Sequence, residues 1–216
     1  MTPGSESVRP SSPMRDESLV RKWLGLPWDE RLDVAFGLIR GFLRSGKFDQ
    51  HRFLILGPAV FIHRRNGRLC AGRVVRLRGG CRLAVIGSPE KPAVLTIGDG
   101  TEIGERTILN VATRVDIGAR CSISWDCDIS DTDYHCIEME EGAPPLPVSE
   151  PVIIEDDVWI GSHCLILKGV TIGRGSVIGA GSVIRRNVPS HSLMVGNPAR
   201  PVARIACWKR NSRCRT

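Results

Sequence analysis

The side chains best suited to acid–base chemistry lie in one short stretch, where His135 follows Asp131 and Asp133. An imidazole has an unperturbed pKa of about 6.5, so at neutral pH it can accept a proton from an attacking hydroxyl. A base positioned for this transfer contributes about 10²–10⁴-fold to a rate, and it needs a partner that fixes its tautomer. We predict His135 as a general base, oriented by Asp133, Asp131 or a backbone carbonyl.

A six-residue repeat dominates the region that follows. Large aliphatic residues recur at intervals of six, and each is followed four positions later by a small or β-branched residue. Neither a helix nor a simple strand has this period. A repeat this short is typical of a solenoid in which each repeat forms one side of a coil. The repeat residues are Ile154, Ile160, Ile166, Ile172, Ile178 and Ile184.

The same repeat begins upstream and is interrupted twice. Two residues are inserted near Asn110, and a much longer interruption at about residues 130–153 contains four prolines. A proline-rich interruption indicates a loop that leaves the coil. Loops on a rigid scaffold often carry binding and catalytic residues, so we expect the site on this loop, which contains His135.

Composition and hydrophobic pattern divide the chain into four parts. The 216 residues are 42% hydrophobic, which suits one domain with a sizeable core. Residues 1–18 are polar and rich in Ser and Pro, and we expect a disordered tail there. Residues 19–50 should form a helical segment, residues 51–202 the solenoid domain, and residues 203–216 a short basic tail.

Apolar residues within the helical segment recur at helical spacing from Pro27 onward. We expect this stripe to pack on the solenoid or on a neighbouring subunit. Because arginines flank it, weak contact with a membrane surface is the alternative. The stripe contains Leu32, Ala35, Phe36, Ile39, Phe42 and Leu43.

The charge and the cysteines limit the possible partners. The net charge of +7 favours a polyanionic ligand, but no interleaved aromatic platform or known motif supports nucleic-acid binding. No apolar run approaches the roughly 20 residues of a membrane-spanning helix, and no signal peptide is evident. The eight cysteines include no CxxC pair. We predict a cytoplasmic protein without disulfides.

Three segments carry a specific resemblance: EDDVWIGSHCLILKGVTIGRGSVIGAGSVI at 155–184, VPSHSLMVGNPAR at 188–200 and ISWDCDISDTDYH at 123–135. They resemble the hexapeptide-repeat acyltransferases, most closely the sugar and polysaccharide O-acetyltransferases such as the galactoside and maltose enzymes. The resemblance implies an all-β fold, a left-handed parallel β-helix, and assembly as a homotrimer. It also implies direct acetyl transfer from acetyl-CoA to a sugar hydroxyl, without a metal.

The resemblance further implies roles for particular residues. His135 matches the catalytic histidine of the family. Asn110 corresponds to an asparagine that holds the acceptor, although its spacing to His135 differs. Arg185 and Arg186 replace the Thr-Lys pair that is common in the family. The positions that bind acetyl-CoA are occupied here by Trp159, Ser162, Ala180, Arg185, Arg186 and Arg200.

Three alternatives remain open. An antibiotic acetyltransferase of the streptogramin or chloramphenicol type would differ only in its acceptor. A γ-carbonic-anhydrase-like enzyme would need three histidines that converge on zinc, but His135, His163 and His191 are spaced 28 residues apart, which does not match a coil of about 18 residues. A non-catalytic trimeric scaffold would have no need for His135 together with Trp159.

Overall fold

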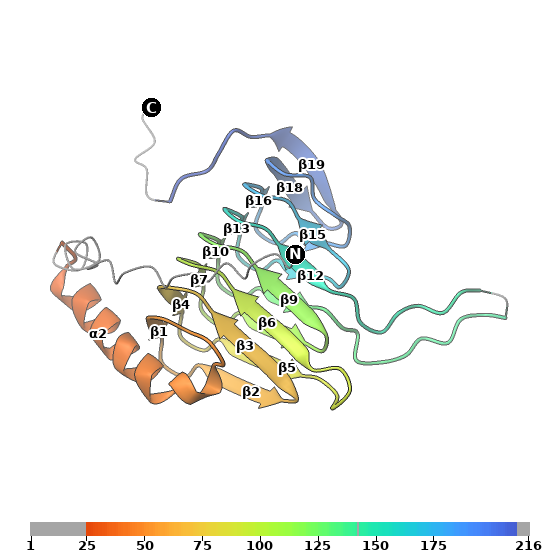
Figure 1. Cartoon of the computed structure of the whole chain (residues 1–216). Coiled ribbons are helices and arrows are strands. Elements are labelled where there is room, and N and C mark those ends of the chain that lie inside the picture. Colours follow the sequence, from red (N-terminus) through yellow and green to blue (C-terminus); the bar gives the residue numbers. More distant parts are fainter. Residues whose placement is uncertain (1–24, 142, 211–216) are drawn as a thin grey trace, which may run out of the picture.

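The computed structural model describes residues 25–141 and 143–210. The chain winds as a left-handed parallel β-helix whose coils each pass through three sheets in a fixed order (Figure 1). The fold class predicted from the repeat and the family resemblance is confirmed. Within the described ranges, no helix is long and apolar enough to cross a membrane.

The strands of the coils form three sheets, which we call B, C and A in chain order. Sheet B contains β1 (Leu54–Leu56), β4 (Val75–Leu77), β7 (Glu102–Ile103), β10 (Ser122–Ile123), β13 (Trp159–Ile160), β16 (Val177–Ile178), β18 (Ser192–Gly196) and β19 (Ala199–Arg204). Sheet C contains β2 (Phe61–Arg65), β5 (Arg82–Ile86), β8 (Ile108–Val111), β11 (Asp128–Ser130), β14 (Leu165–Ile166) and β17 (Val183–Ile184). Sheet A contains β3 (Gly67–Ala71), β6 (Ala93–Ile97), β9 (Arg114–Ile117), β12 (Val152–Ile154) and β15 (Thr171–Ile172).

Equivalent residues of successive coils pair in register, so the repeat isoleucines stack in columns inside the prism. Ile123 is paired with Ile160, for example, and both are at most 2% exposed. The residues four positions later are also buried, as the repeat predicts, with one exception. Asp133 falls at the same position in the count of six, but it is exposed because the chain leaves the coil after Ser130.

The turns between sheets form three edges of the prism, which we call the B–C, C–A and A–B edges. The long loop, residues 131–151, replaces one turn at the C–A edge, between β11 and β12. It extends away from the body of the β-helix (Figure 1). The interruption predicted from the prolines is therefore a loop that leaves a single edge.

Helix α2 (Trp28–Leu43) begins directly after Pro27, as predicted, and is followed by the short helix η1 (Ser45–Lys47). It covers β1, the first strand of sheet B. Its buried residues are Gly37 and Gly41, and a Cβ atom at Gly41 would lie 2.2 Å from the carbonyl oxygen of Leu54. The apolar stripe lies on the opposite, exposed side. The expectation that it packs on the solenoid of the same chain is therefore wrong.

The chain ends its path along the prism with a hairpin and a returning segment. β18 and β19 pair in antiparallel fashion, and β19 extends beyond the predicted domain limit at residue 202. Residues 205–210 then run back along the A–B edge, starting where the backbone N–H of Ile205 donates to the carbonyl of His191 at 2.8 Å. The tail predicted for residues 1–18 and the end of the basic tail, residues 211–216, lie outside the described residues.

Candidate active site

A short antiparallel ladder closes the long loop at its root. The backbone N–H of Asp133 donates to the carbonyl of Val148, and that of Glu150 donates to the carbonyl of Asp131, both at 2.9 Å. An isolated bridge between the two arms lies beside these bonds. The ladder therefore fixes the direction of the chain just before His135.

Lys168, which lies in the following coil, also stabilises the root of the long loop. Its ammonium group donates to the carboxylate of Asp133 and to the carbonyl of Pro147, which lie on opposite arms of the loop. The Lys168 side chain is only 17% exposed, whereas that of Asp133 is 42% exposed. This bridge ties both arms to the β-helix two residues away from His135.

Asp131 anchors the root to the preceding coil. Its carboxylate is fully buried and accepts four hydrogen bonds of 2.6–2.8 Å. The donors are the backbone N–H groups of Ala112, Thr113 and Arg114 and the hydroxyl of Thr113. These residues form the turn that contains the two-residue insertion seen in the sequence. The two interruptions of the repeat are therefore bonded to each other.

His135 itself is exposed, and its ring makes no hydrogen bond to any residue of the described ranges. Neither carboxylate predicted to orient it contacts the ring, because Asp131 is bonded to the preceding coil and Asp133 to Lys168. The structure places His135 on a supported loop, with its imidazole available to a partner outside this chain.

Asn110 lies on the same C–A edge as the loop. It occupies β8 in register with Ser130 of β11, and its carbonyl accepts a hydrogen bond from the N–H of Asp131 at 3.2 Å. The side chain is half-buried, on the outer face of sheet C. The structure thus brings Asn110 and the loop that carries His135 to one edge of the prism.

Asp128 is a candidate that the sequence reasoning missed. It lies on the outer face of β11, and its Oδ1 atom is buried without a hydrogen-bond partner among the described residues. Burial raises the pKa of this carboxyl. Burial also raises the pKa of Tyr134, followed in importance by the charges of Asp131 and Asp128. An orphaned carboxylate beside the loop root is a candidate substrate contact. The signal for Asp128 in the sequence is an acidic residue that lies between two buried strand positions.

Ser162 and Ala180 lie at the B–C edge in consecutive coils. The backbone N–H of Gly181 donates to the carbonyl of Ser162 at 2.8 Å, which holds the two turns together. Within the described part of the chain, the N–H groups of Ser162 and Ala180 donate no hydrogen bond. Ala180 is exposed and Ser162 half-buried. This edge therefore presents backbone donors that a ligand with carbonyl oxygens can use.

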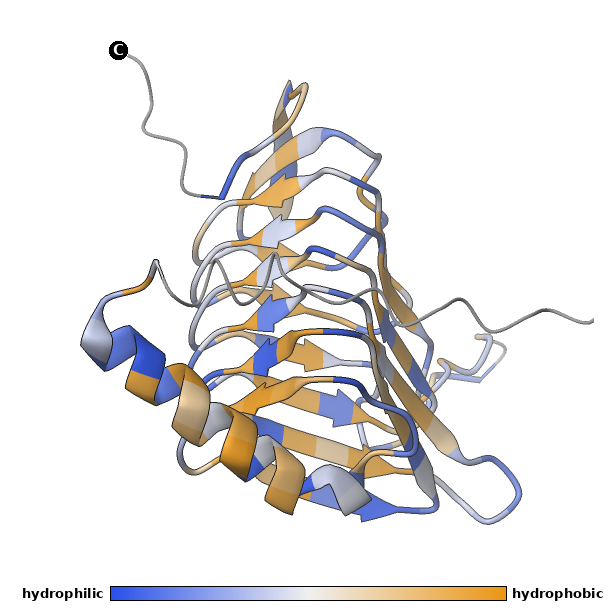
Figure 2. Ribbon diagram, turned by 60° about the vertical axis from the view of Figure 1, so that its left-hand side comes forward, coloured by the Kyte–Doolittle hydropathy of each residue, from blue (hydrophilic) through white to orange (hydrophobic). Residues whose placement is uncertain are grey.

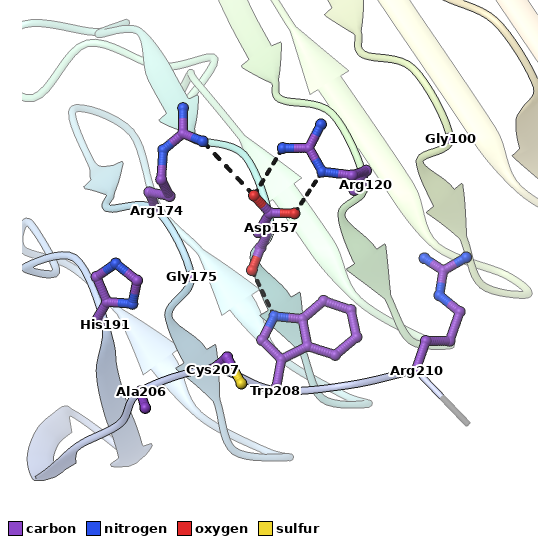
Figure 3. A pocket seen from close by; sticks show the side chains of 10 residues that line it. All are labelled: Gly100, Arg120, Asp157, Arg174, Gly175, His191, Ala206, Cys207, Trp208 and Arg210. Atoms are coloured by element: carbon purple, nitrogen blue, oxygen red, sulfur yellow. Dashed lines mark hydrogen bonds and ion pairs between the residues drawn. The ribbon is translucent and has the colours of Figure 1, made fainter. Parts of the chain in front are cut away.

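Trp159 lies on the outer face of sheet B, where it is 41% exposed. The indole of Trp208, from the returning segment, lies against it with 6.0 Å between the ring centroids. Its Nε1–H also donates to the backbone carbonyl of Asp157 (Figure 3). The residue that resemblance assigns to acetyl-CoA is thus partly covered by the C-terminal segment of its own chain.

A cavity of about 460 Å³ lies between this segment and the A–B edge (Figure 3). Two of its basic side chains are already paired. Arg120 bonds the carboxylate of Asp157 at 2.6 and 2.7 Å, and this hydrogen bonding lowers the pKa of Asp157. Arg174 lies 3.7 Å from the same carboxylate. The cavity therefore has no strong excess of positive charge, and we assign no anion to it.

The predicted arginine contacts are exposed at two other places. Arg185 and Arg186 follow β17 at the C–A edge, and Arg200 lies in β19 opposite Val195. Within residues 25–141 and 143–210, none of the three forms an ion pair. They are therefore available to an anionic ligand. In the same ranges, no group of three or more metal-binding side chains lies together.

One chain does not bring all the predicted residues together. A prism side of about six residues, at about 3.3 Å per residue, separates neighbouring edges by roughly 15–20 Å. His135 and Asn110 lie at the C–A edge, whereas Ser162 and Ala180 lie at the B–C edge. Within one chain, these two groups of residues therefore lie on different edges of the prism.

These features define a left-handed β-helix protein built from hexapeptide repeats. Residues 151–186 match the family model described as bacterial transferase hexapeptide (six repeats). The chain therefore carries the repeats of the hexapeptide transferase family, and the family resemblance predicted from the sequence is confirmed.

Sequence relatives bear names of one activity. A Schizosaccharomyces pombe protein provisionally named an acetyltransferase is 34% identical over 113 residues, which cover 52% of this chain and 44% of that protein. A Mycobacterium tuberculosis protein with a similar name is 32% identical over 112 residues, covering 50% of this chain and 36% of that protein. The chain thus spans less than half the length of these curated relatives.

Solved structures share the fold. NeuO, a polysialic-acid-specific acetyltransferase, superposes with a TM-score of 0.57 at 24% identity, over 79% of this chain and 93% of NeuO. AntD, an N-acyltransferase from Bacillus cereus solved with a dTDP-amino sugar and coenzyme A, gives a TM-score of 0.62 at 22% identity, over 79% of this chain and 89% of AntD. At these identities the comparison establishes the fold.

Proposed function

We propose that this protein is an acetyl-CoA-dependent O-acetyltransferase that modifies a hydroxyl of a sugar or polysaccharide precursor. The observation that carries the proposal is the supported loop, which presents the free imidazole of His135 beside a hexapeptide-repeat β-helix. Relatives named acetyltransferases and the CoA-bound neighbour AntD support it.

In the proposed reaction, the acceptor hydroxyl attacks the carbonyl carbon of the acetyl thioester while His135 takes the hydroxyl proton. The C–S bond then breaks, and the leaving CoA thiolate receives that proton from His135. A free imidazole suits this role because its unprotonated ring nitrogen can accept a proton. Asp133 and Asp131 act by holding the loop root, since their carboxylates are bonded to Lys168 and to the preceding coil. Asn110 would contact the acceptor at the same C–A edge.

The co-substrate acetyl-CoA supplies the activated acetyl thioester. The free N–H groups of Ser162 and Ala180 fit the amide carbonyls of its pantetheine arm, and the N–H of Ser162 can also donate to the acyl oxygen as charge develops there. Trp159 offers an exposed aromatic face beside them. The exposed guanidinium groups that fit the phosphates belong to Arg185, Arg186 and Arg200.

We further propose that the working form is a homotrimer with its sites between subunits. His135 projects from the C–A edge, while the free donors lie at the B–C edge of the same chain. Cyclic assembly would bring the C–A edge of one copy to the B–C edge of the next and would generate identical sites. The division of residues between two edges supports this arrangement.

An acceptor screen tests the proposed activity. Purified protein is incubated with acetyl-CoA and a panel of acceptors, and release of the free thiol of CoA is followed. The panel contains neutral sugars, amino sugars, oligosialic acid, and the antibiotics chloramphenicol and a streptogramin. We expect turnover with a sugar hydroxyl. Turnover confined to an amine or to an antibiotic would contradict the proposed acceptor class.

A further inference from the structure

The outer face of α2 is apolar, and among the described residues only Arg31 lies against it, 5.9 Å from the centroid of the Trp28 ring. Trp28, Phe36 and Ile39 are 77%, 54% and 54% exposed, although each has a large apolar side chain. Figure 2 shows hydrophobic residues recurring along α2, which lies outside the sheets. We call this outer face the α2 stripe, and it consists of Trp28, Leu32, Phe36, Ile39, Phe42 and Leu43.

The helix could bury this stripe against the β-helix only by giving up the close contact that its glycines make with β1. Gly37 and Gly41 face β1, and a Cβ atom at Gly37 would lie 2.7 Å from a methyl group of Ile55. Arg40 adds a 2.7 Å bond from its Nε to the carbonyl of Leu56. The glycine face therefore fits β1 closely, and within residues 25–141 and 143–210 the stripe remains exposed.

Charge argues against an anionic bilayer as the occupant. Arg40 and Arg44 direct their guanidinium groups to backbone carbonyls of the β-helix. Beside the first half of the stripe, the exposed charges of Asp29 and Asp33 are acidic. The half-buried Arg31 lies over the Trp28 ring, and its Nε donates to the carbonyl of Leu26. Acidic groups at this position are repelled by an anionic membrane surface. A protein surface is the better fit.

The charges are complementary to those of a second copy in antiparallel orientation. Acidic residues lie at the start of α2, and the exposed Lys47 lies just beyond its end. Around a twofold axis that places Phe36 opposite Ile39, Leu32 falls opposite Leu43. In the same register Lys47 of each chain falls opposite Trp28 of the other, one residue from Asp29.

We infer that the α2 stripe is a twofold interface that joins two copies of this chain, helix against antiparallel helix. Because α2 covers the first coil, this contact leaves the B–C and C–A edges free. It therefore adds to the proposed trimer, converting three copies into six, and it would pair two single chains equally well. The inference does not depend on the proposed activity.

Light scattering on the full-length protein tests the pairing. The double variant Phe36→Glu, Ile39→Glu should have half the mass of the wild-type assembly, with an unchanged far-ultraviolet circular dichroism spectrum. Val202→Glu, which alters an exposed apolar residue of β19 at the other end of the prism, should keep the full mass. Equal masses for the wild type and the double variant would overturn the inference. So would a threefold drop, which would place the stripe in a threefold contact.

A charge exchange tests the antiparallel register. Lys47→Glu should raise the dissociation constant of the pairing by roughly two- to tenfold, because it places like charges together. Adding Asp29→Lys should reverse that loss. Failure of the second change to restore pairing, or co-sedimentation of the wild type with anionic vesicles through the same stripe, would contradict the proposed twofold contact.

Discussion

The indole of Trp208 lies against that of Trp159, with ring centroids 6.0 Å apart and planes inclined by 43°. Trp159 belongs to the first strand of a repeat coil, whereas Trp208 comes from the segment that returns along the prism after the last strand. A residue proposed to contact acetyl-CoA is therefore covered on one side by its own C-terminal segment.

Trp208→Ala should strengthen the binding of acetyl-CoA. An aromatic pair is worth about 0.5–1.5 kcal/mol beyond area burial, so release of Trp159 from it should lower the Kd by roughly two- to tenfold. Isothermal titration with CoA measures the change, and Phe61→Ala, at an exposed position of β2 at the far end of sheet C, serves as the control. Weaker binding in the Trp208 variant would instead make this indole part of the binding site.

Asp131→Ala should destabilise the fold far more than Asp133→Ala. Asp131 is fully buried with four hydrogen bonds, and its loss leaves buried donors unsatisfied, which we expect to cost about 2–5 kcal/mol. Asp133 is exposed in its pair with Lys168, which limits that contribution to about 1 kcal/mol or less. Thermal unfolding at one fixed protein concentration compares them. Equal melting temperatures would contradict the anchoring role of Asp131.

The hexapeptide periodicity predicted most of the fold because each isoleucine of the repeat points into the prism and stacks on its equivalent in the next coil. The buried columns that contain Ile123 and Ile160 follow directly from the spacing of six. The period also located the loop, since prolines cannot continue the parallel strands. The period does not hold at Asp133, which is exposed because the chain leaves the coil before it.

Contacts outside the repeat could not be predicted in the same way. Helical spacing identified the apolar stripe of α2 but not the face that meets β1. Gly37 and Gly41 form that face, because the close approach to β1 that they allow stabilises the contact more than burial of larger side chains would. The partner of Asp131 lies one coil away, and Trp208 docks from an irregular segment. No sequence period relates such residues.

Two inactive variants should restore activity to each other if the site lies between subunits. His135→Ala removes the base at the C–A edge, and Trp159→Ala alters sheet B beside the B–C edge. In trimers assembled at random from equal amounts of both chains, about one quarter of the sites combine the intact edges. Co-expression with two different affinity tags isolates the mixed trimers. Mixed assemblies that stay as inactive as either parent would contradict the shared site.

Arg186→Ala should weaken CoA binding by roughly ten- to a hundredfold, since a charged hydrogen bond to phosphate is worth about 1.5–3 kcal/mol. Dephospho-CoA should be affected less if Arg186 meets the 3′-phosphate. Arg65→Ala is the matched control, because Arg65 is an exposed arginine of β2 at the opposite end of sheet C. An equal loss in both variants would indicate a general effect of charge.

The replacement of His135 by Ala tests the account most directly. With a sugar acceptor found in the screen, kcat should fall at least about 10²-fold while the Kd for acetyl-CoA changes little, because a base is removed and the donor contacts remain. His63→Ala, an exposed histidine of β2, should keep full turnover. Near-normal kcat in the His135 variant would contradict the proposed mechanism.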